Sequence, residues 1–297
     1  MSIYPDYYKK FRCIAGNCLH SCCIGWQICI DDETFAGYMN SSDAFSQRLK
    51  MNIETDEQCF VLGENERCPF LNDDNLCDII INKGENWLCE ICAQHPRFRN
   101  YIGENEQIGL GLCCEEVARI ILNKSGKTLF EGEPIAENET EKAYFKLQNI
   151  IIEILQNREL SLSKRFEKLE DMFGAGLPHR NVNDIALEMK GLQRLEKDWE
   201  KYIEKIPQGN PAVMDDEKWC VPFEQLAVYF IYRHLPGGLE DGRYVERIAF
   251  AGFSVYAIAM MFGGEDMAEL EEISRRFSAE VEYCEENVET LLEILGN

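Results

Sequence analysis

The chain has 297 residues, 45% of them hydrophobic, which is enough for a sizeable core in one large or two smaller domains. Its 53 acidic residues outnumber the 30 basic ones and give a net charge of −23. This charge repels phosphate backbones, so we expect neither nucleic acid nor an anionic membrane as a partner. The sequence lacks both an apolar run of about 18 residues and a signal-peptide pattern at its start, so we expect a cytoplasmic protein.

Cysteines are concentrated in the first part of the chain, where residues 1–114 hold twelve of the fourteen. Cytoplasmic thiols are normally kept reduced, so metal ligation explains this density better than a disulfide framework does. Residues 1–123 also have frequent Gly, Asn and Asp and no long helical period. We therefore expect an irregular, cysteine-rich, metal-binding region there, without a periodic apolar core of its own.

The first cysteine motif is Cys13-x4-Cys18-x3-Cys22-Cys23. Thiolates this close can converge on one metal centre when neighbouring glycines let the loop turn. Adjacent side chains diverge in regular structure, so we expect at most one of Cys22 and Cys23 to ligate the same centre. Asp31, which follows the motif, either orients a ligand or caps a helix, and its position favours capping.

The strongest element of the second motif is Cys89-x2-Cys92, because two residues between thiolates suit a turn that points both sulfurs to one side. Cys68 and Cys77 precede this pair. Cys113-Cys114 ends the region, and again only one of the two is expected to be a ligand. We expect an iron–sulfur cluster of the 4Fe–4S type, with zinc as the alternative, and nine candidate metal ligands: Cys13, Cys18, Cys22, Cys23, Cys68, Cys77, Cys89, Cys92 and Cys114. The remaining front cysteines, Cys29 and Cys59, fit a packing role.

The rest of the chain has the apolar spacing of helices. Proline and glycine clusters separate several of these segments. The predicted helices cover 137–155, 184–204, 217–235, 242–262 and 266–295. We therefore expect a mainly α protein, with a cysteine-cluster region at 1–123 and a helical domain at 124–297.

Several motifs carry a family resemblance: the first cysteine motif with Gly25-Trp26 and Ile30-Asp31, then Cys68-Pro69-Phe70-Leu71, Leu76-Cys77-Asp78-Ile79, Cys89-Glu90-x-Cys92 with Pro96-Arg97, and Cys114-x-Glu116-x-Ala118-Arg119. Together they resemble the bacterial flagellin lysine-N-methylase family, part of a wider group of zinc- or iron-chelating cysteine-cluster proteins. The chain departs from the family pattern at Glu115, where proline is usual, and at His95, where tyrosine is common.

The resemblance implies an S-adenosylmethionine-dependent lysine N-methyltransferase that acts on flagellin and carries an iron–sulfur cluster. Trp26, Asp31 and Arg97, which lie in the matched motifs, are the residues expected at the S-adenosylmethionine site. The sequence has neither a Gly-rich turn of the Rossmann kind after a strand nor a Cys-x3-Cys-x2-Cys motif of the radical type. A polar displacement at the methyl carbon is therefore the simplest chemistry.

Such a displacement needs a neutral lysine, whose amine has a pKa of about 10.4 in free solution. Tyr229, Tyr232 and His234 are candidate catalytic residues, because aromatic rings hold cations and histidine accepts a proton near neutral pH. Their spacing equally fits a buried amphipathic helix. Two other functions also fit the cysteines: a non-catalytic iron–sulfur or redox protein, and a zinc-stabilised interaction module.

Overall fold

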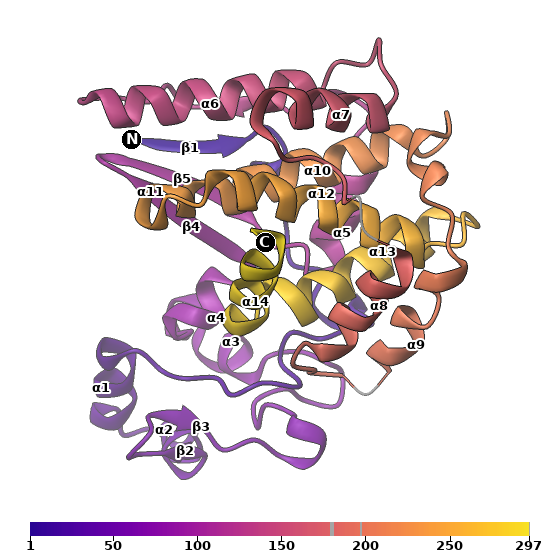
Figure 1. Cartoon of the computed structure of the whole chain (residues 1–297). Helices are drawn as coiled ribbons and strands as arrows, with labels where there is room; N and C mark the ends of the chain where they lie inside the picture. The colour runs from indigo at the N-terminus through magenta and orange to yellow at the C-terminus, as the bar shows by residue number, and fades with distance from the viewer. Residues whose placement is uncertain (179–180, 197, 297) are drawn as a thin grey trace. The chain divides into compact units, whose positions relative to one another are not determined.

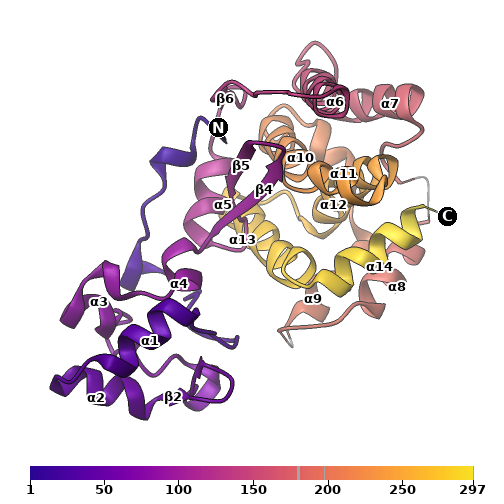
Figure 2. The same cartoon turned by 90° about the vertical axis from the view of Figure 1, so that its left-hand side faces the viewer.

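The structure, a computed structural model, describes residues 1–178, 181–196 and 198–296. It divides the chain into two compact units (Figure 1, Figure 2). Unit 1 consists of Met1–Phe11 and Phe98–Asn297, and unit 2 is Arg12–Arg97. Unit 2 is therefore an insertion in unit 1. This division differs from the one expected at residue 123, because the first strand of the chain pairs with a strand beyond residue 98.

Unit 1 contains a four-stranded sheet in the order β4-β5-β1-β6, formed by Arg97–Ile102, Asn105–Leu110, Ser2–Pro5 and Phe130–Glu131. The strands β1 and β5 are parallel, with Ser2 opposite Glu106. The short strand β6 is antiparallel to β1, with Tyr4 opposite Glu131. This pairing joins the first residues of the chain to residues beyond 104 within one sheet.

Helices make up most of unit 1: α5 (Glu115–Leu122), α6 (Glu139–Leu155), α7 (Leu162–Phe173), α8 (Val182–Gly191), α9 (Trp199–Ile203), α10 (Cys220–His234), α11 (Gly238–Asp241), α12 (Tyr244–Met261), α13 (Met267–Phe277) and α14 (Glu285–Leu295). The expected mainly α fold is confirmed. Side-chain caps begin several of them; Asn138, for example, accepts from the N–H of Glu141 at 2.9 Å at the start of α6. Short 3-10 turns at Tyr8–Lys10, Ile206–Gln208, Pro211–Asp215 and Leu235–Gly237 connect the rest.

Three predicted helices are confirmed by α6, α10 and α12, whose apolar residues fill the core of unit 1. The single helix predicted over 184–204 is wrong. Between α8 and α9, the carboxylate of Glu280 accepts the N–H groups of Leu195 and Glu196 at 2.8 and 2.7 Å, which replaces helical hydrogen bonds. The helix predicted over 266–295 is also interrupted, by a π-helical turn at Ser278–Glu282 before α14 begins.

One helix among the described residues, α12, is long and apolar enough to cross a membrane by length and composition alone. Two thirds of its 18 residues, 67%, are buried inside the structure. It packs against α10, and Figure 1 shows the two helices side by side. This burial is that of a core helix.

Unit 2 is built from short elements: 3-10 turns at Ala15–Asn17, Glu64–Glu66 and Glu85–Trp87, the helices α1 (Asp32–Asn40), α2 (Ala44–Met51), α3 (Asp78–Lys83) and α4 (Glu90–Gln94), and the hairpin of β2 (Ile53–Glu54) and β3 (Cys59–Phe60). It has its own apolar core, in which Tyr38, Leu49 and Phe70 are fully buried. The expectation that the front of the chain lacks a core is therefore wrong. The apolar residues are spread over elements too short to show a period.

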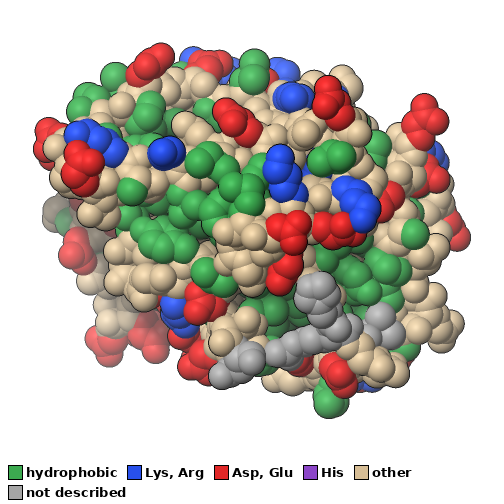
Figure 3. Space-filling view, turned by 45° about the horizontal axis from the view of Figure 1, so that its top comes forward, with side chains coloured by type: hydrophobic (Ala, Val, Ile, Leu, Met, Phe, Trp, Pro, Cys, Tyr) green, Lys and Arg blue, Asp and Glu red, His purple; other side chains and the backbone are tan. Residues whose placement is uncertain are grey.

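Charges on the surface are mixed in sign. On the face shown in Figure 3, acidic and basic side chains are interspersed with apolar ones. Many basic groups have an acidic partner; Lys9 lies 2.9 Å from Glu131, and Arg243 pairs with both Asp241 and Glu289.

Candidate functional site

Backbone pairing brings three cysteine-bearing segments of unit 2 together. The N–H of Cys68 donates to the carbonyl of Cys23 at 2.9 Å. The chain then turns, and Leu71 pairs antiparallel with Cys77. Cys23, Cys68 and Cys77 therefore lie on adjacent segments, although 54 residues separate the first from the last.

Two cysteines of unit 2 occupy the N-cap positions of helices, Cys77 before α3 and Cys89 before α4. Free N–H groups at a helix start favour a thiolate over a thiol. At Cys89 the largest effect is a hydrogen bond with the thiol of Cys92, which lowers the pKa of Cys89 and raises that of Cys92. At Cys77, burial raises the pKa and the N–H groups of Ile80 and Ile79 oppose that rise. Within the Cys89–Cys92 pair, Cys89 is therefore the thiol that ionises first.

The charges of five thiols influence one another: those of Cys23, Cys68, Cys77, Cys89 and Cys92, which we call the thiol cluster. Burial, together with negative charge at Cys23, Cys77 and Cys89, raises the pKa of Cys68 to about 12. A hydrogen bond with Cys22 lowers the pKa of Cys23 to about 7. A bound cation would relieve the mutual repulsion of these thiolates.

The thiol cluster offers the donor chemistry of a soft-metal site: several thiols, two of them at helix starts, in an apolar core. Within residues 1–178, 181–196 and 198–296, however, no three His, Cys, Asp or Glu side chains are arranged to hold a metal ion. The five thiols therefore have the right chemistry for a thiophilic metal. That they bind one metal centre together is a proposal.

The other predicted ligands have local partners or lie elsewhere. The sulfur of Cys13 accepts from the N–H of Ala15 at 3.4 Å, and that of Cys18 donates to the carbonyl of His20 at 3.4 Å. Cys22 lies against Cys23 through their side chains. Cys114 belongs to unit 1, where it precedes α5. Five of the nine predicted ligands thus form the thiol cluster.

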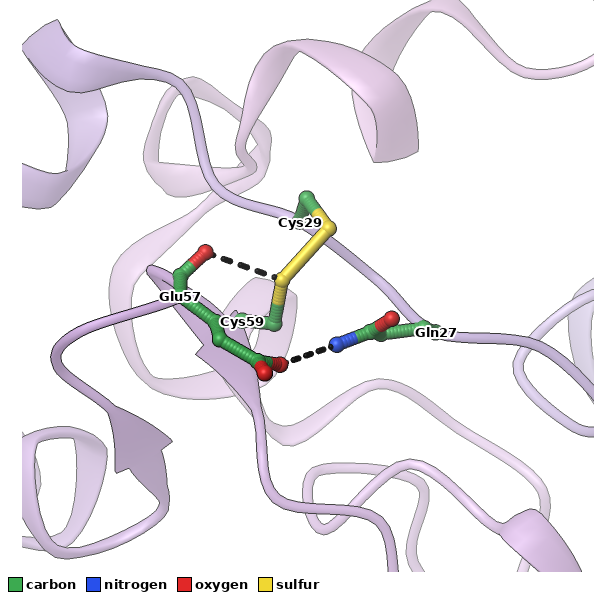
Figure 4. Close-up of a disulfide and its surroundings, with 4 residues drawn as sticks. All are labelled: Gln27, Cys29, Glu57 and Cys59. Carbon is green, nitrogen blue, oxygen red and sulfur yellow. Dashed lines mark hydrogen bonds between the residues drawn. A yellow bond between two sulfur atoms is a disulfide. The ribbon is translucent and has the colours of Figure 1, made fainter.

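Cys29 and Cys59 form a disulfide, drawn in Figure 4, so the packing role predicted for them is wrong. They face each other across antiparallel segments, between the hydrogen bonds from Phe60 to Ile28 (3.0 Å) and from Ile30 to Gln58 (2.7 Å). Side chains at such a non-hydrogen-bonded position lie closest across two strands. The disulfide fastens the segment that leads into α1 to the β2–β3 hairpin.

Asp31 caps α1, as its position predicts. Its Oδ1 accepts from the N–H of Thr34 at 2.9 Å, and its Oδ2 accepts from the N–H of Glu90 at 2.7 Å. Burial alone would raise the pKa of Asp31, but the hydrogen bonds from Glu90 and Thr34 outweigh it and lower the pKa. Asp31 thereby holds the start of α4 beside Cys89.

The other two residues expected at the S-adenosylmethionine site are Trp26 and Arg97. The Nε1 of Trp26 donates to the carbonyl of Cys22 at 2.7 Å, and its ring centroid lies 6.4 Å from that of His95. The Nε2 of His95 is buried without a hydrogen-bond partner in the described chain. Burial lowers the pKa of His95 to about 4, and the charge of Arg97 adds to this. Binding of the cofactor by Trp26, Asp31 and Arg97 stays a prediction.

The candidate catalytic residues lie on α10, in the core of unit 1, where each is less than a tenth exposed. The hydroxyl of Tyr229 donates to Glu282 at 3.0 Å, and the Nε2 of His234 lies 2.6 Å from the same carboxylate. Tyr232 lies apart from them: its hydroxyl donates to the carbonyl of Ile3 at 2.7 Å. The structure brings Tyr229 and His234 together and separates Tyr232, and all three positions fit the buried helix that the sequence also allowed.

The centre of this network was missed in the sequence. Glu282 comes from the π-helical turn, a kind of distortion often found at functional sites. Arg233 completes it, with its Nε 3.3 Å from Glu282 and its guanidinium in contact with the rings of Phe98 and Tyr283. Burial raises and Arg233 lowers the pKa of Glu282, and the net effect is a lowered pKa. An Arg-His pair ending an apolar helix was the available signal for a buried acid.

Comparison with known proteins finds relatives in Salmonella. The chain is 27% identical over 151 residues to the flagellar biosynthetic protein FliU of Salmonella muenchen, which covers 48% of this chain and 89% of that protein. It is 28% identical over 127 residues, 40% of its length, to the lysine-N-methylases of Salmonella typhimurium and Salmonella choleraesuis. This match spans about a third, 32%, of the two methylases. No family model and no solved structure matches the chain.

Proposed function

We propose that this protein is an S-adenosylmethionine-dependent lysine N-methyltransferase that acts on flagellin. The observation that carries the proposal is the similarity to two lysine-N-methylases. The similarity to a flagellar biosynthetic protein supports flagellin as the substrate. Because the chain matches only part of the methylases, the activity, the methyl donor and the substrate are all inferences for this protein.

In the proposed reaction, the lone pair of a neutral lysine amine attacks the methyl carbon of S-adenosylmethionine. The carbon–sulfur bond breaks, S-adenosylhomocysteine leaves, and the amine loses a proton. In the described structure Tyr229 and His234 are buried and bonded to Glu282. The proton is therefore not routed through them here. A role for Tyr229, Tyr232 or His234 in holding the amine stays a prediction, tested by the rate of a Tyr232→Phe variant.

For the thiol cluster we propose an iron–sulfur cluster, with zinc as the alternative. Its five cysteines supply soft donors, and the cap of Asp31 on α4 supports Cys89. Bound there, the group would supply structural support or redox sensing. Cys89→Ser and Cys92→Ser should each lower the metal content, whereas Cys220→Ser, at the start of α10, is the matched control.

Co-expression with a flagellin, followed by intact-mass measurement of that flagellin, tests the activity. The expected result is added mass of one to three methyl groups on individual lysines. The rate should rise with pH as the target amine deprotonates. Unmodified flagellin, together with no calorimetric binding of S-adenosylmethionine to metal-replete protein, would refute the methyltransferase proposal.

A second candidate function, a non-catalytic redox or metal protein, is favoured by one observation: unit 2 holds a disulfide and free thiols around one core. Anaerobic purification with metal and sulfide analysis tests the group itself. Iron and inorganic sulfide with a brown colour support the iron–sulfur cluster. Colourless protein with stoichiometric zinc would show that the bound metal is zinc and not an iron–sulfur cluster. Metal-replete protein that does not bind S-adenosylmethionine would favour this second function.

A further inference from the structure

Unit 1 contains a cavity of about 400 Å³ beside the 3-10 turn Tyr8–Lys10 and the end of α5. Its volume lies within the range of small-molecule sites. The charged residues that line it are all basic: Lys10, Arg119 and Lys124. The charge that lines this cavity is therefore opposite in sign to the net charge of the chain, −23.

Two of these cations are held in place by acids. Arg119 donates to both oxygens of Glu116, at 2.7 and 2.6 Å, and the Nζ of Lys124 lies 2.7 Å from Asp6. Neither acid lines the cavity. Lys10 is exposed and has no acidic partner in the part of the chain that the structure describes. The cavity thus has two positioned cations and one positive charge that no acid offsets.

Tyr7 also lines the cavity, and it is only 4% exposed. Its hydroxyl has no hydrogen-bond partner among the described residues, and the oxygen is accessible rather than sealed in the core. The phenol is a donor at neutral pH, since burial raises its pKa further. The hydroxyl is therefore available to donate to an acceptor that enters the basic cavity.

In the loop after α5, the backbone carbonyls of residues 124–126 already accept hydrogen bonds. Gln225 donates to the carbonyls of Lys124 and Gly126, at 3.2 and 2.8 Å, and Arg158 donates to the carbonyl of Ser125 at 2.9 Å. The N–H groups of Ser125 and Gly126 have no acceptor among the described residues. The backbone of residues 124–126 therefore has unpaired N–H donors, whereas its carbonyls are already engaged.

We propose that this cavity binds the phosphate group of a small organic phosphate. Lys10, Lys124, Tyr7 and the loop N–H groups offer more donors than the two oxygens of one carboxylate accept, and a phosphate group supplies three acceptor oxygens. The cavity is larger than a phosphate ion, which leaves room for the organic part. This inference does not depend on the proposed methyl transfer.

Calorimetric titration of the full chain with inorganic pyrophosphate tests the site, with citrate at matched ionic strength as the carboxylate probe. Pyrophosphate should bind saturably and more weakly as salt rises. Lys10→Glu and Tyr7→Phe should each weaken binding roughly tenfold, since each removes a donor to a charged oxygen. Lys9→Glu is the matched control, because Lys9 adjoins Lys10 but lies outside the cavity and pairs with Glu131.

Thermal melting of each variant separates a lost site from a lost fold, and Lys10 is exposed, so Lys10→Glu should melt like the wild-type protein. Any of three results overturns the proposal: no saturable binding of pyrophosphate at millimolar concentration, an equal loss of binding in Lys9→Glu, or citrate binding as tightly as pyrophosphate. The last of these would replace phosphate by carboxylate as the group recognised.

Discussion

Asp31 accepts a hydrogen bond at 2.7 Å from the backbone N–H of Glu90, which lies 59 residues further along the chain. The same carboxylate caps α1, so one side chain fixes the starts of two helices of unit 2. Because Glu90 directly follows Cys89, this bond ties the helix cap to the thiol cluster.

Asp31→Ala should therefore lower the stability of unit 2 by about 1–2 kcal/mol, the usual range for a lost helix cap. Hydrogen exchange should speed up both at the start of α1 and at the amide of Glu90. Asp32→Ala, on the exposed first turn of the same helix, is the control and should change neither. Faster exchange at α1 with an unchanged Glu90 amide would contradict the double role.

Glu282→Gln should destabilise unit 1 by roughly 3–5 kcal/mol, the cost of leaving a buried charge without its partner. The charge in question is Arg233, which would keep its aromatic neighbours but lose the carboxylate. Urea unfolding measures the loss. Glu285→Gln, three residues on and exposed, is the control. Similar midpoints for both variants would show that the ion pair contributes little.

Acid should destabilise unit 1 through His234. Burial lowers its pKa in spite of the bond to Glu282, so the unfolded chain takes up the proton at a higher pH than the folded one. The stabilising contribution is complete above about pH 6.5, the ordinary histidine value, and is lost as pH falls towards the lowered folded pKa. Urea midpoints measured between pH 7.5 and 5 should fall less steeply in His234→Gln than in the wild-type protein or in His20→Gln, whose side chain is exposed.

Reduction of the Cys29–Cys59 disulfide should lower the stability of unit 2 by about 2–4 kcal/mol. Alkylation of the unfolded, unreduced chain should modify every cysteine except these two, which peptide mapping by mass spectrometry would show. The Cys29→Ala, Cys59→Ala double variant should reproduce the loss without any reductant. Full alkylation of both sites in protein purified under air would show that the bond does not form.

The long helices could be predicted because their own residues carry the pattern: α10 and α12 are apolar over four turns or more. The features that the sequence did not predict depend on residues far away in the chain. The break before α9 is made by Glu280, about 85 residues away. The disulfide depends on the register of two strands, which nothing near Cys29 specifies.

The candidate site also has residues that the sequence could indicate and one that it could not. The thiols of Cys89 and Cys92 lie on one helical turn and contact each other, as their spacing allows, while metal binding by the pair stays a prediction. Glu282 could not be singled out, since the sequence near it is uniformly acidic. Burial in the core of unit 1 separates Glu280 and Glu282 from the exposed Glu285 and Glu286.

The insertion of unit 2 between β1 and β5 has a consequence for synthesis on the ribosome. Ser2 cannot pair with Glu106 until about 100 further residues have been made, which takes roughly 5–20 s at common elongation rates. All of residues 12–97 emerge in that interval. Unit 2 therefore has time to fold and to form its disulfide before β1 can pair with β5, so its ten cysteines can find their partners before the sheet of unit 1 forms.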